Sequence, residues 1–274
     1  MSRASKKSTK RVKPPVASAV LLPPDRHALS ATLAYFVIVA LLAVATYSRN
    51  SIYHTYVTLW KSVSESSPNK RRAHENYGQA LSTAGSLSRN PEEAHRLYLE
   101  AMRQFDMVMA LPDDGSVPLR DLYREIGVVH FRMGDYDDAV TAWRTGLHYA
   151  PYDPSLLNNL SIVLMQQGKI EEAAQEAKNA LYGDPNMPQA LNTLGQVYMA
   201  KREYAKAAEY FLKALDREPD MPARYWNAAL ALDQAGKPAD ALQYARKYQM
   251  MERDPAGQQR AAGFIQFLTQ KLAK

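Results

Sequence analysis

The stretch that decides the fold is LNTLGQVYMAKREYAKAAEYFLKALDREP, residues 191–219. A stretch of the same pattern, YREIGVVHFRMGDYDDAVTAWRTGLHYAP, occupies residues 123–151, 68 residues earlier. In the later copy, Gly195 is followed twelve residues on by Ala207 and twelve further on by Pro219. The earlier copy has the same spacing. Because 68 is twice 34, the two copies predict an internal repeat with a period of 34 residues.

Three columns of residues recur with this period. A small residue, an alanine and a proline each return every 34 residues: Gly127, Ser161, Gly195 and Ala229; Ala139, Ala173, Ala207 and Ala241; Pro151, Pro185 and Pro219. Three columns in phase argue against an ordinary helical bundle with accidental periodicity.

The pattern resembles the tetratricopeptide repeat (TPR) family, whose consensus reads W-x2-L-G-x2-Y…A-x3-F…P. The resemblance covers about residues 69–253 and implies an all-α solenoid of helix-turn-helix repeats. Repeats are then expected at 69–117, 120–153, 154–187, 188–221 and 222–253, followed by a capping helix at 254–274.

The columns have a physical interpretation in such a repeat. The small residue and the alanine lie where the two helices cross, while Trp143 and Phe211 fill the gap toward the next repeat. The prolines end the second helix, because the residue before a proline avoids the α region. Gly134, Gly168 and Gly236 open the short turn between the helices.

The first repeat is irregular. Gly78 and Ala101 take the small and alanine positions, but 23 residues separate them where twelve are usual, so eleven are extra. Asn90-Pro91 is a strong helix start. The eleven residues therefore predict a second helix lengthened to about 20 residues. The extension would be a docking surface or would pack on the adjacent segment; the sequence favours neither.

Residues 49–68 resemble the second half of a repeat. The spacing of Trp60, Val63 and Pro68 equals the spacing of Trp143, Gly146 and Pro151. We therefore expect a helix without a first-helix partner, with Trp60 packed near Tyr77.

A membrane anchor is predicted upstream. Residues 28–48, ALSATLAYFVIVALLAVATYS, carry no charge and are long enough to span a bilayer. Residues 1–27 hold seven basic residues and one acidic residue, equal to the whole net charge of +6, and are predicted to be a disordered cytoplasmic tail. The repeats would then lie across the membrane, in the bacterial periplasm. A cleaved signal peptide is the alternative, since Ala43-Val44-Ala45 fits a cleavage site.

No enzyme signature is present. The chain lacks cysteine, and its six histidines show neither an i, i+4 pair nor an H-E-x-x-H motif. There is no phosphate-binding glycine loop and no nucleophile elbow. His130 occupies a column where an aromatic is usual, which favours packing. Since residues 28–274 are neutral overall, no nucleic-acid surface is indicated. We predict no catalytic residue, metal or cofactor.

The resemblance implies that the first helices line a concave, peptide-binding groove. Its sixth positions hold Asn76, Glu125, Asn159, Thr193 and Asn227, and its fifth positions hold Arg124, Asn158, Asn192 and Trp226. Asparagine offers a donor and an acceptor together and can hold a peptide backbone. The candidate site is therefore Asn76, Arg124, Asn158, Asn159, Asn192, Thr193, Gln196 and Asn227. The Lys and Asn pairs of the family's carboxylate clamp are missing.

The sequence thus predicts a membrane-anchored scaffold that holds an extended peptide of a protein partner during assembly of an envelope or secreted complex. Two alternatives stay open. Residues 47–81 resemble the junction between the last membrane helix and the TPRs in multi-span glycosyltransferase-like proteins, so the chain would be an accessory subunit of such an enzyme. The second alternative is an organellar import-type receptor with the opposite orientation, in which the repeats face the cytosol.

Overall fold

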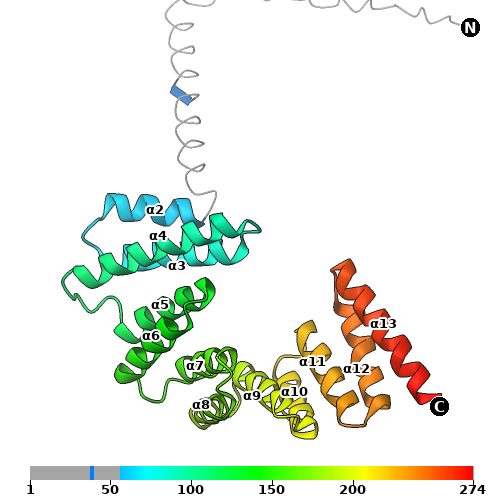
Figure 1. Ribbon diagram of the computed structural model, residues 1–274. Coiled ribbons are helices and arrows are strands. Elements are labelled where there is room, and N and C mark those ends of the chain that lie inside the picture. Colours follow the sequence, from blue (N-terminus) through cyan, green and yellow to red (C-terminus); the bar gives the residue numbers. More distant parts are fainter. Residues whose placement is uncertain (1–37, 40–55, 274) are drawn as a thin grey trace, which may run out of the picture. The chain divides into compact units, whose positions relative to one another are not determined.

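The computed structural model describes residues 38–39 and 56–273 of the chain. Residues 56–273 contain twelve α-helices and no strand, so the all-α prediction is confirmed (Figure 1). The helices are α2 (Tyr56–Ser66), α3 (Arg71–Leu87), α4 (Pro91–Ala110), α5 (Leu119–Met133), α6 (Tyr136–Tyr149), α7 (Pro154–Gln166), α8 (Ile170–Gly183), α9 (Pro188–Ala200), α10 (Tyr204–Arg217), α11 (Pro222–Gln234), α12 (Pro238–Met251) and α13 (Pro255–Leu272).

The helices form consecutive hairpins. α3 pairs with α4, α5 with α6, α7 with α8, α9 with α10 and α11 with α12, and each second helix also packs on the first helix of the next hairpin. α2 packs on α3 at one end, and α13 packs on α12 at the other. Such stacking is required because one hairpin cannot bury its apolar faces alone.

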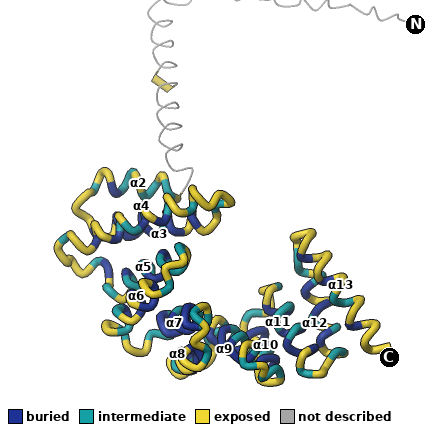
Figure 2. Tube along the Cα trace, viewed as in Figure 1, coloured by how far each residue is buried: buried dark blue, intermediate teal, exposed yellow. Residues whose placement is uncertain are grey.

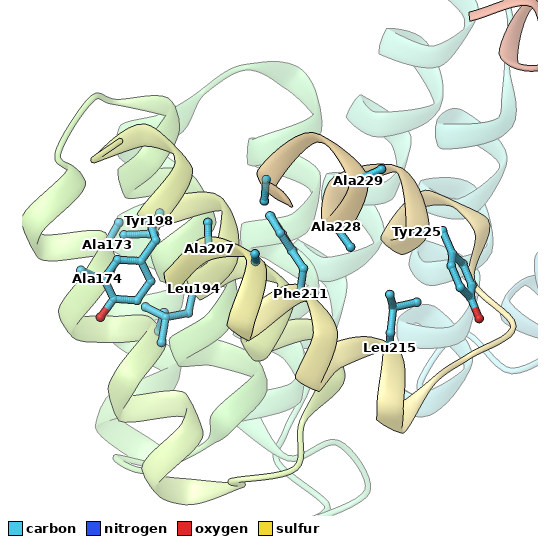
Figure 3. Close-up of a cluster of buried hydrophobic side chains, with 14 of the residues drawn as sticks. Ala173, Ala174, Leu194, Tyr198, Ala207, Phe211, Leu215, Tyr225, Ala228 and Ala229 are labelled. Carbon is cyan, nitrogen blue, oxygen red and sulfur yellow. The ribbon is translucent and has the colours of Figure 1, made fainter. Parts of the chain in front are cut away.

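The core runs through the hairpins as a chain of buried inner faces (Figure 2). All four alanines of the repeating column, Ala139, Ala173, Ala207 and Ala241, are completely buried. Figure 3 shows the part of this core around Ala207, Phe211 and Leu215. At about 25 cal/mol per Å² of apolar surface, this shared burial is the main term that stabilises the solenoid.

The crossing of each hairpin combines small and large residues in a complementary way. A Cβ on Gly127 would lie 2.3 Å from Nε1 of Trp143, and one on Gly195 would lie 2.6 Å from Cε1 of Phe211. Both rings therefore cover the glycine of their own repeat, whereas we expected them to fill the gap toward the next repeat. Where the small column holds Ser161 or Ala229, the ring position holds an alanine instead, Ala177 or Ala245. A side chain on the first helix thus leaves no room for a ring on the second.

The turns use a left-handed residue, as predicted. Gly134, Gly168 and Gly236 have φ of 89°, 75° and 77°. The same column holds Arg202 in the fourth hairpin, with φ of 60°. Glycine adopts this conformation without a steric penalty, whereas arginine does not.

The eleven extra residues of the first repeat are divided between both helices, which corrects the prediction for the second helix alone. Nine residues of α3 follow Gly78, against five after Ser161 in α7. Ten residues of α4 precede Ala101, against three before Ala173 in α8. α3 is therefore longer by four residues, about one helical turn, and α4 is longer by seven residues, about two turns. α4 has the expected 20 residues, and Asn90 Oδ1 caps it by accepting hydrogen bonds from the backbone N–H groups of Glu92 and Glu93.

Whole turns keep the buried faces of both helices in register. Seven residues beyond Gly78, Gly85 lies so close to Tyr98 that a Cβ would be 2.6 Å from its ring. Tyr98 is in turn seven residues before Phe105, which covers Gly78. The extension therefore repeats the glycine–aromatic contact two turns further along the hairpin.

At the start of the described array, α2 ends the stack without a first-helix partner of its own. Val57 and Trp60 pack against the cluster that contains Tyr77 and Leu81. This is the packing that the spacing of Trp60, Val63 and Pro68 suggested.

The predicted tail, membrane helix and residues 49–55 lie outside the described residues, apart from Ile38 and Val39, which are helical. Among the described residues, no helix has both the length and the apolarity needed to cross a bilayer.

Candidate functional site

The predicted groove residues lie on the first helices α3, α5, α7, α9 and α11, and the structure links two of them directly. Nδ2 of Asn227 on α11 donates a 3.1 Å hydrogen bond to Oδ1 of Asn192 on α9. A fifth position in one repeat thus contacts a sixth position in the next. This bond leaves the Asn192 amino group and the Asn227 carbonyl oxygen free for a further partner.

Two predicted residues are buried beneath this face. Asn158 is 4% exposed and Thr193 is 2% exposed. The Oδ1 atom of Asn158 is enclosed and has no hydrogen-bond partner. A buried oxygen without a partner costs about 1–3 kcal/mol. These side chains lie below the surface that a ligand would touch directly.

Three predicted amides are half-buried and unpaired. In the part of the chain that the structure describes, the side chains of Asn76, Asn159 and Gln196 form no intramolecular hydrogen bond. They lie on α3, α7 and α9. Each presents one acceptor oxygen and one amino group to solvent or to a ligand.

Arg124 is engaged with neighbouring carboxylates. Its guanidinium donates to Asp121 at 2.9 Å and to Glu125 at 3.2 Å. Burial raises the pKa of Glu125, while the adjacent Arg124 acts against that rise. Arg124 therefore neutralises this acidic stretch of α5 and is not a free cation for a ligand.

A buried glutamate, Glu75 on α3, extends this charged end. Its side chain is 2% exposed and is paired with Arg72 at 2.7 Å. Burial raises the pKa of Glu75, Arg72 lowers it, and the charges of Asp121 and Glu125 raise it further. The charged residues of the face thus gather on α3 and α5, while its fifth and sixth positions from α7 to α11 are uncharged.

An apolar hollow lies next to one of the free amides. A cavity of about 150 Å³ is lined by Val128, Phe131, Arg132, Trp143, Asn159 and Ile162. An apolar cavity of this size admits a benzene-sized group. Sequence reasoning missed it, although Val128 and Ile162 are apolar residues at equivalent positions, three residues beyond the sixth position.

A second hollow, of about 340 Å³, lies away from the predicted residues. It is formed by residues of α8, α9, α10 and the loop before α9, and is lined by Leu181, Pro185, Leu191, Tyr210, Lys213, Asp216 and Arg217. Of these two hollows, the smaller one adjoins an unpaired amide on the first helices and the larger one does not, so we place the candidate site at the smaller hollow.

The hairpins, their turns and their 34-residue period are now established. Residues 124–188 and 192–258 match the family model of the tetratricopeptide repeat. The matched residues, which form the hairpins from α5 to α12, carry the tetratricopeptide repeat pattern. The match begins within α5, so the hairpin α3–α4 with its eleven extra residues precedes the matched part.

Solved structures with the same fold include the APC/C hetero-tetramer Cut9–Hcn1, which aligns with a TM-score of 0.60 and 17% identity. The alignment covers 76% of this chain but only 38% of that chain. YrrB, a TPR protein with an unusual peptide-binding site, aligns at a TM-score of 0.47 and 18% identity, over 74% of this chain and 97% of its own. MamA aligns with a TM-score of 0.49 and 18% identity, over 59% of this chain and 92% of its own. At 17% identity, the similarity to Cut9–Hcn1 shows a shared fold and nothing further. No curated protein matches the sequence.

Proposed function

We propose that the protein is a TPR scaffold that binds an extended peptide segment of a protein partner on its first helices. The observation that carries this proposal is the apolar hollow beside the unpaired amide of Asn159. The tetratricopeptide repeats support a role in protein–protein interaction. Direct contact is proposed for Asn76, Asn159, Asn192, Gln196 and Asn227, while Asn158 and Thr193 support them from below.

An extended peptide presents alternating donors and acceptors along its backbone. A free carboxamide satisfies one donor and one acceptor at once, so Asn159 and Gln196 would fix the backbone independently of sequence. An apolar peptide side chain would then enter the hollow between Phe131, Trp143 and Ile162. The hollow supplies selectivity, and burial of one apolar side chain contributes about 1.5–3 kcal/mol.

We further propose that residues 28–48 anchor the scaffold in a bacterial inner membrane, with the basic tail in the cytoplasm and the repeats in the periplasm. The support is the uncharged run of 21 residues behind a tail with a net charge of +6. An anchor would raise the local concentration of partners at the membrane during assembly of an envelope or secreted complex. A C-terminal reporter that is active only outside the cytoplasm tests this orientation, and an inactive reporter on a stable fusion would contradict it.

Peptide binding is tested by site-specific photo-crosslinking in the full-length protein. A photoreactive residue at Gln196 on α9 should yield a crosslink to one partner, and mass spectrometry should assign it to one continuous peptide. The matched control places the same residue at Gln175, which is exposed on the second helix α8. A second variant, Ile162→Trp, fills the hollow and should abolish the Gln196 crosslink. An equal crosslink from Gln175, or one that Ile162→Trp leaves unchanged, would disprove the proposed site.

A further inference from the structure

The turn between α5 and α6 brings together three potential metal ligands. His130 lies in the last turn of α5, Asp135 precedes α6 as its N-cap residue, and Asp138 lies in the first turn of α6. Nδ1 of His130 is 3.7 Å from Oδ2 of Asp135. One ligand atom from each of the three residues lies within 4.8 Å of the other two.

In the described part of the chain, these three side chains make no hydrogen bond, helix cap or Lys/Arg ion pair that would account for their placement. Nδ1 of His130 is enclosed and has no hydrogen-bond partner, and its distance to Asp135 is too long for one. The Asp135 side chain does not cap α6, although its position is suited to capping. Within the described residues, neither Asp135 nor Asp138 forms an ion pair with a lysine or an arginine.

The corresponding turn of the hairpin α9–α10 holds a different set of residues at these positions. There the three columns carry Tyr198, Glu203 and Lys206. Nζ of Lys206 lies 2.5 Å from Oε2 of Glu203 and 5.4 Å from the centre of the Tyr198 ring. Lys206 thus places its positive charge next to both the Glu203 carboxylate and the Tyr198 ring.

The other two regular repeats keep the same balance of charge. Their two acidic or basic columns hold Lys169 with Glu172 and Lys237 with Asp240, in each case one cation and one anion. In the α5–α6 turn both columns are aspartate. The first column, which holds Leu164, Tyr198 and Leu232 in the other repeats, is here a histidine with a ring nitrogen 3.7 Å from Asp135. Among these four repeats, this one alone has no lysine in either column and has a third potential ligand, His130, beside them.

We propose that His130, Asp135 and Asp138 bind a divalent first-row transition-metal ion. One imidazole and two carboxylates suit Zn²⁺, Co²⁺ or Mn²⁺ rather than Mg²⁺ or Ca²⁺, which prefer oxygen ligands alone. The ion would take the place that the Lys206 ammonium occupies in the α9–α10 turn. It would join the end of α5 to the start of α6.

The geometry requires only a small adjustment. Ligand atoms around a tetrahedral zinc ion are about 3.4 Å apart, since each lies about 2.0–2.2 Å from the metal. The 3.7 Å separation of Nδ1 and Oδ2 is close to that value. The remaining distances, up to 4.8 Å, close by rotation of the aspartate side chains, which are at the surface. Three protein ligands leave a position for water or for a side chain of a bound partner.

The test is titration of the purified full-length protein, free of any histidine tag, with Zn²⁺ by calorimetry and with Co²⁺ by visible absorption. The wild type should bind one ion and gain thermal stability in proportion to metal concentration. Asp138→Lys copies the α9–α10 turn, and it should lower the affinity at least about tenfold while raising the melting temperature of the metal-free protein. His130→Phe keeps a ring in the packing column and should also lower the affinity about tenfold or more.

The matched control is Glu172→Gln, at the column of Asp138 in the next repeat, which should leave binding unchanged. Circular dichroism of each variant verifies folding, and Asp138→Asn replaces Asp138→Lys if the lysine variant is unfolded. The proposal is overturned if the wild type shows no saturable binding of one ion. It is equally overturned if the Asp138 and His130 variants bind as tightly as the wild type.

Discussion

The hairpins α3–α4 and α9–α10 build the same crossing at different lengths. In both, a phenylalanine ring covers a glycine on the facing helix, and an added Cβ would lie 2.5 Å from Phe105 at Gly78 and 2.6 Å from Phe211 at Gly195. The hairpin α9–α10 makes this contact once. The hairpin α3–α4 makes it again two turns further on, with Gly85 and Tyr98. A repeat thus gains length in whole turns without rotating its buried faces.

The two hairpins differ in what they bury beside that crossing. The fifth position holds Glu75 in α3 and Asn192 in α9. The glutamate is nearly inaccessible and is paired with Arg72, whereas the asparagine joins a neutral hydrogen bond to the next repeat. The longer hairpin therefore gains apolar contacts and carries an electrostatic cost that the regular hairpin avoids.

The largest effect is expected from Gly195→Ala. Phe211 is 1% exposed and cannot move aside, so the added methyl group should destabilise the protein by about 3 kcal/mol in urea unfolding. Gly78→Ala should cost a similar amount if the two crossings are equivalent. In the double variant Gly195→Ala/Phe211→Ala, the loss should be smaller than the sum of the single losses, because the ring is the obstacle. Gly263→Ala on α13, with open space around its Cα, is the control and should be neutral or stabilising.

A smaller loss is expected from Trp60→Ala. α2 covers the first hairpin alone, and the partly buried Trp60 packs on the cluster that includes Tyr77. Removing the ring should destabilise the α3–α4 hairpin by about 2 kcal/mol and raise amide exchange there more than in α9–α10. Lys61→Ala, on the exposed side of α2, should change stability by less than about 0.5 kcal/mol. If Trp60→Ala and Lys61→Ala change the free energy of unfolding by the same amount, α2 is not part of the packed array.

The buried charge is tested through pH. Because the pKa of Glu75 is raised by burial above its ordinary value of 4.5, its favourable contribution is present below pH 4.5 and is lost as pH rises through the raised pKa. At pH 7, Glu75→Gln should therefore stabilise the protein by about 1 kcal/mol, and this gain should disappear as pH falls toward 4.5.

The reciprocal variant Asn192→Glu places the same carboxylate in the regular hairpin. It should lose stability at pH 7 and recover part of it in acid. Chemical denaturation between pH 4.5 and pH 8 measures both variants. A Glu75→Gln gain that is independent of pH would show that the charge is not the cause.

The smallest effect concerns the turn of α9–α10. Arg202 has φ of 60° where the neighbouring repeats use glycine. Arg202→Gly should stabilise the protein by about 0.5–1 kcal/mol, because the relief of backbone strain exceeds the added freedom of the unfolded chain. Gly168→Arg, the reverse change in the α7–α8 turn, should destabilise by about 1 kcal/mol. Thermal unfolding of both variants measures these changes in stability. If the two variants change stability in the same direction, backbone strain at Arg202 is not the cause.

Local signals in the sequence were enough to predict the period, the hairpins and their ends. Gly134, Gly168 and Gly236 mark the turns because glycine adopts the left-handed conformation without a steric penalty. Asn90-Pro91 marks the start of α4 because a cap and a fixed φ act within one turn. These signals depend on neighbours along the chain. They can therefore be recognised in the sequence before the fold is known.

What the sequence determined by itself was thus a solenoid of helical hairpins with a 34-residue period and an asparagine-rich face. The tertiary structure decided that Asn158 and Thr193 lie beneath that face, that Asn192 bonds to Asn227, and that the eleven extra residues divide between α3 and α4. It also decided that His130 meets two aspartates across a turn. Each of these depends on the angle at which two helices cross and on the volume of side chains from both, and residue spacing along one helix does not contain that information.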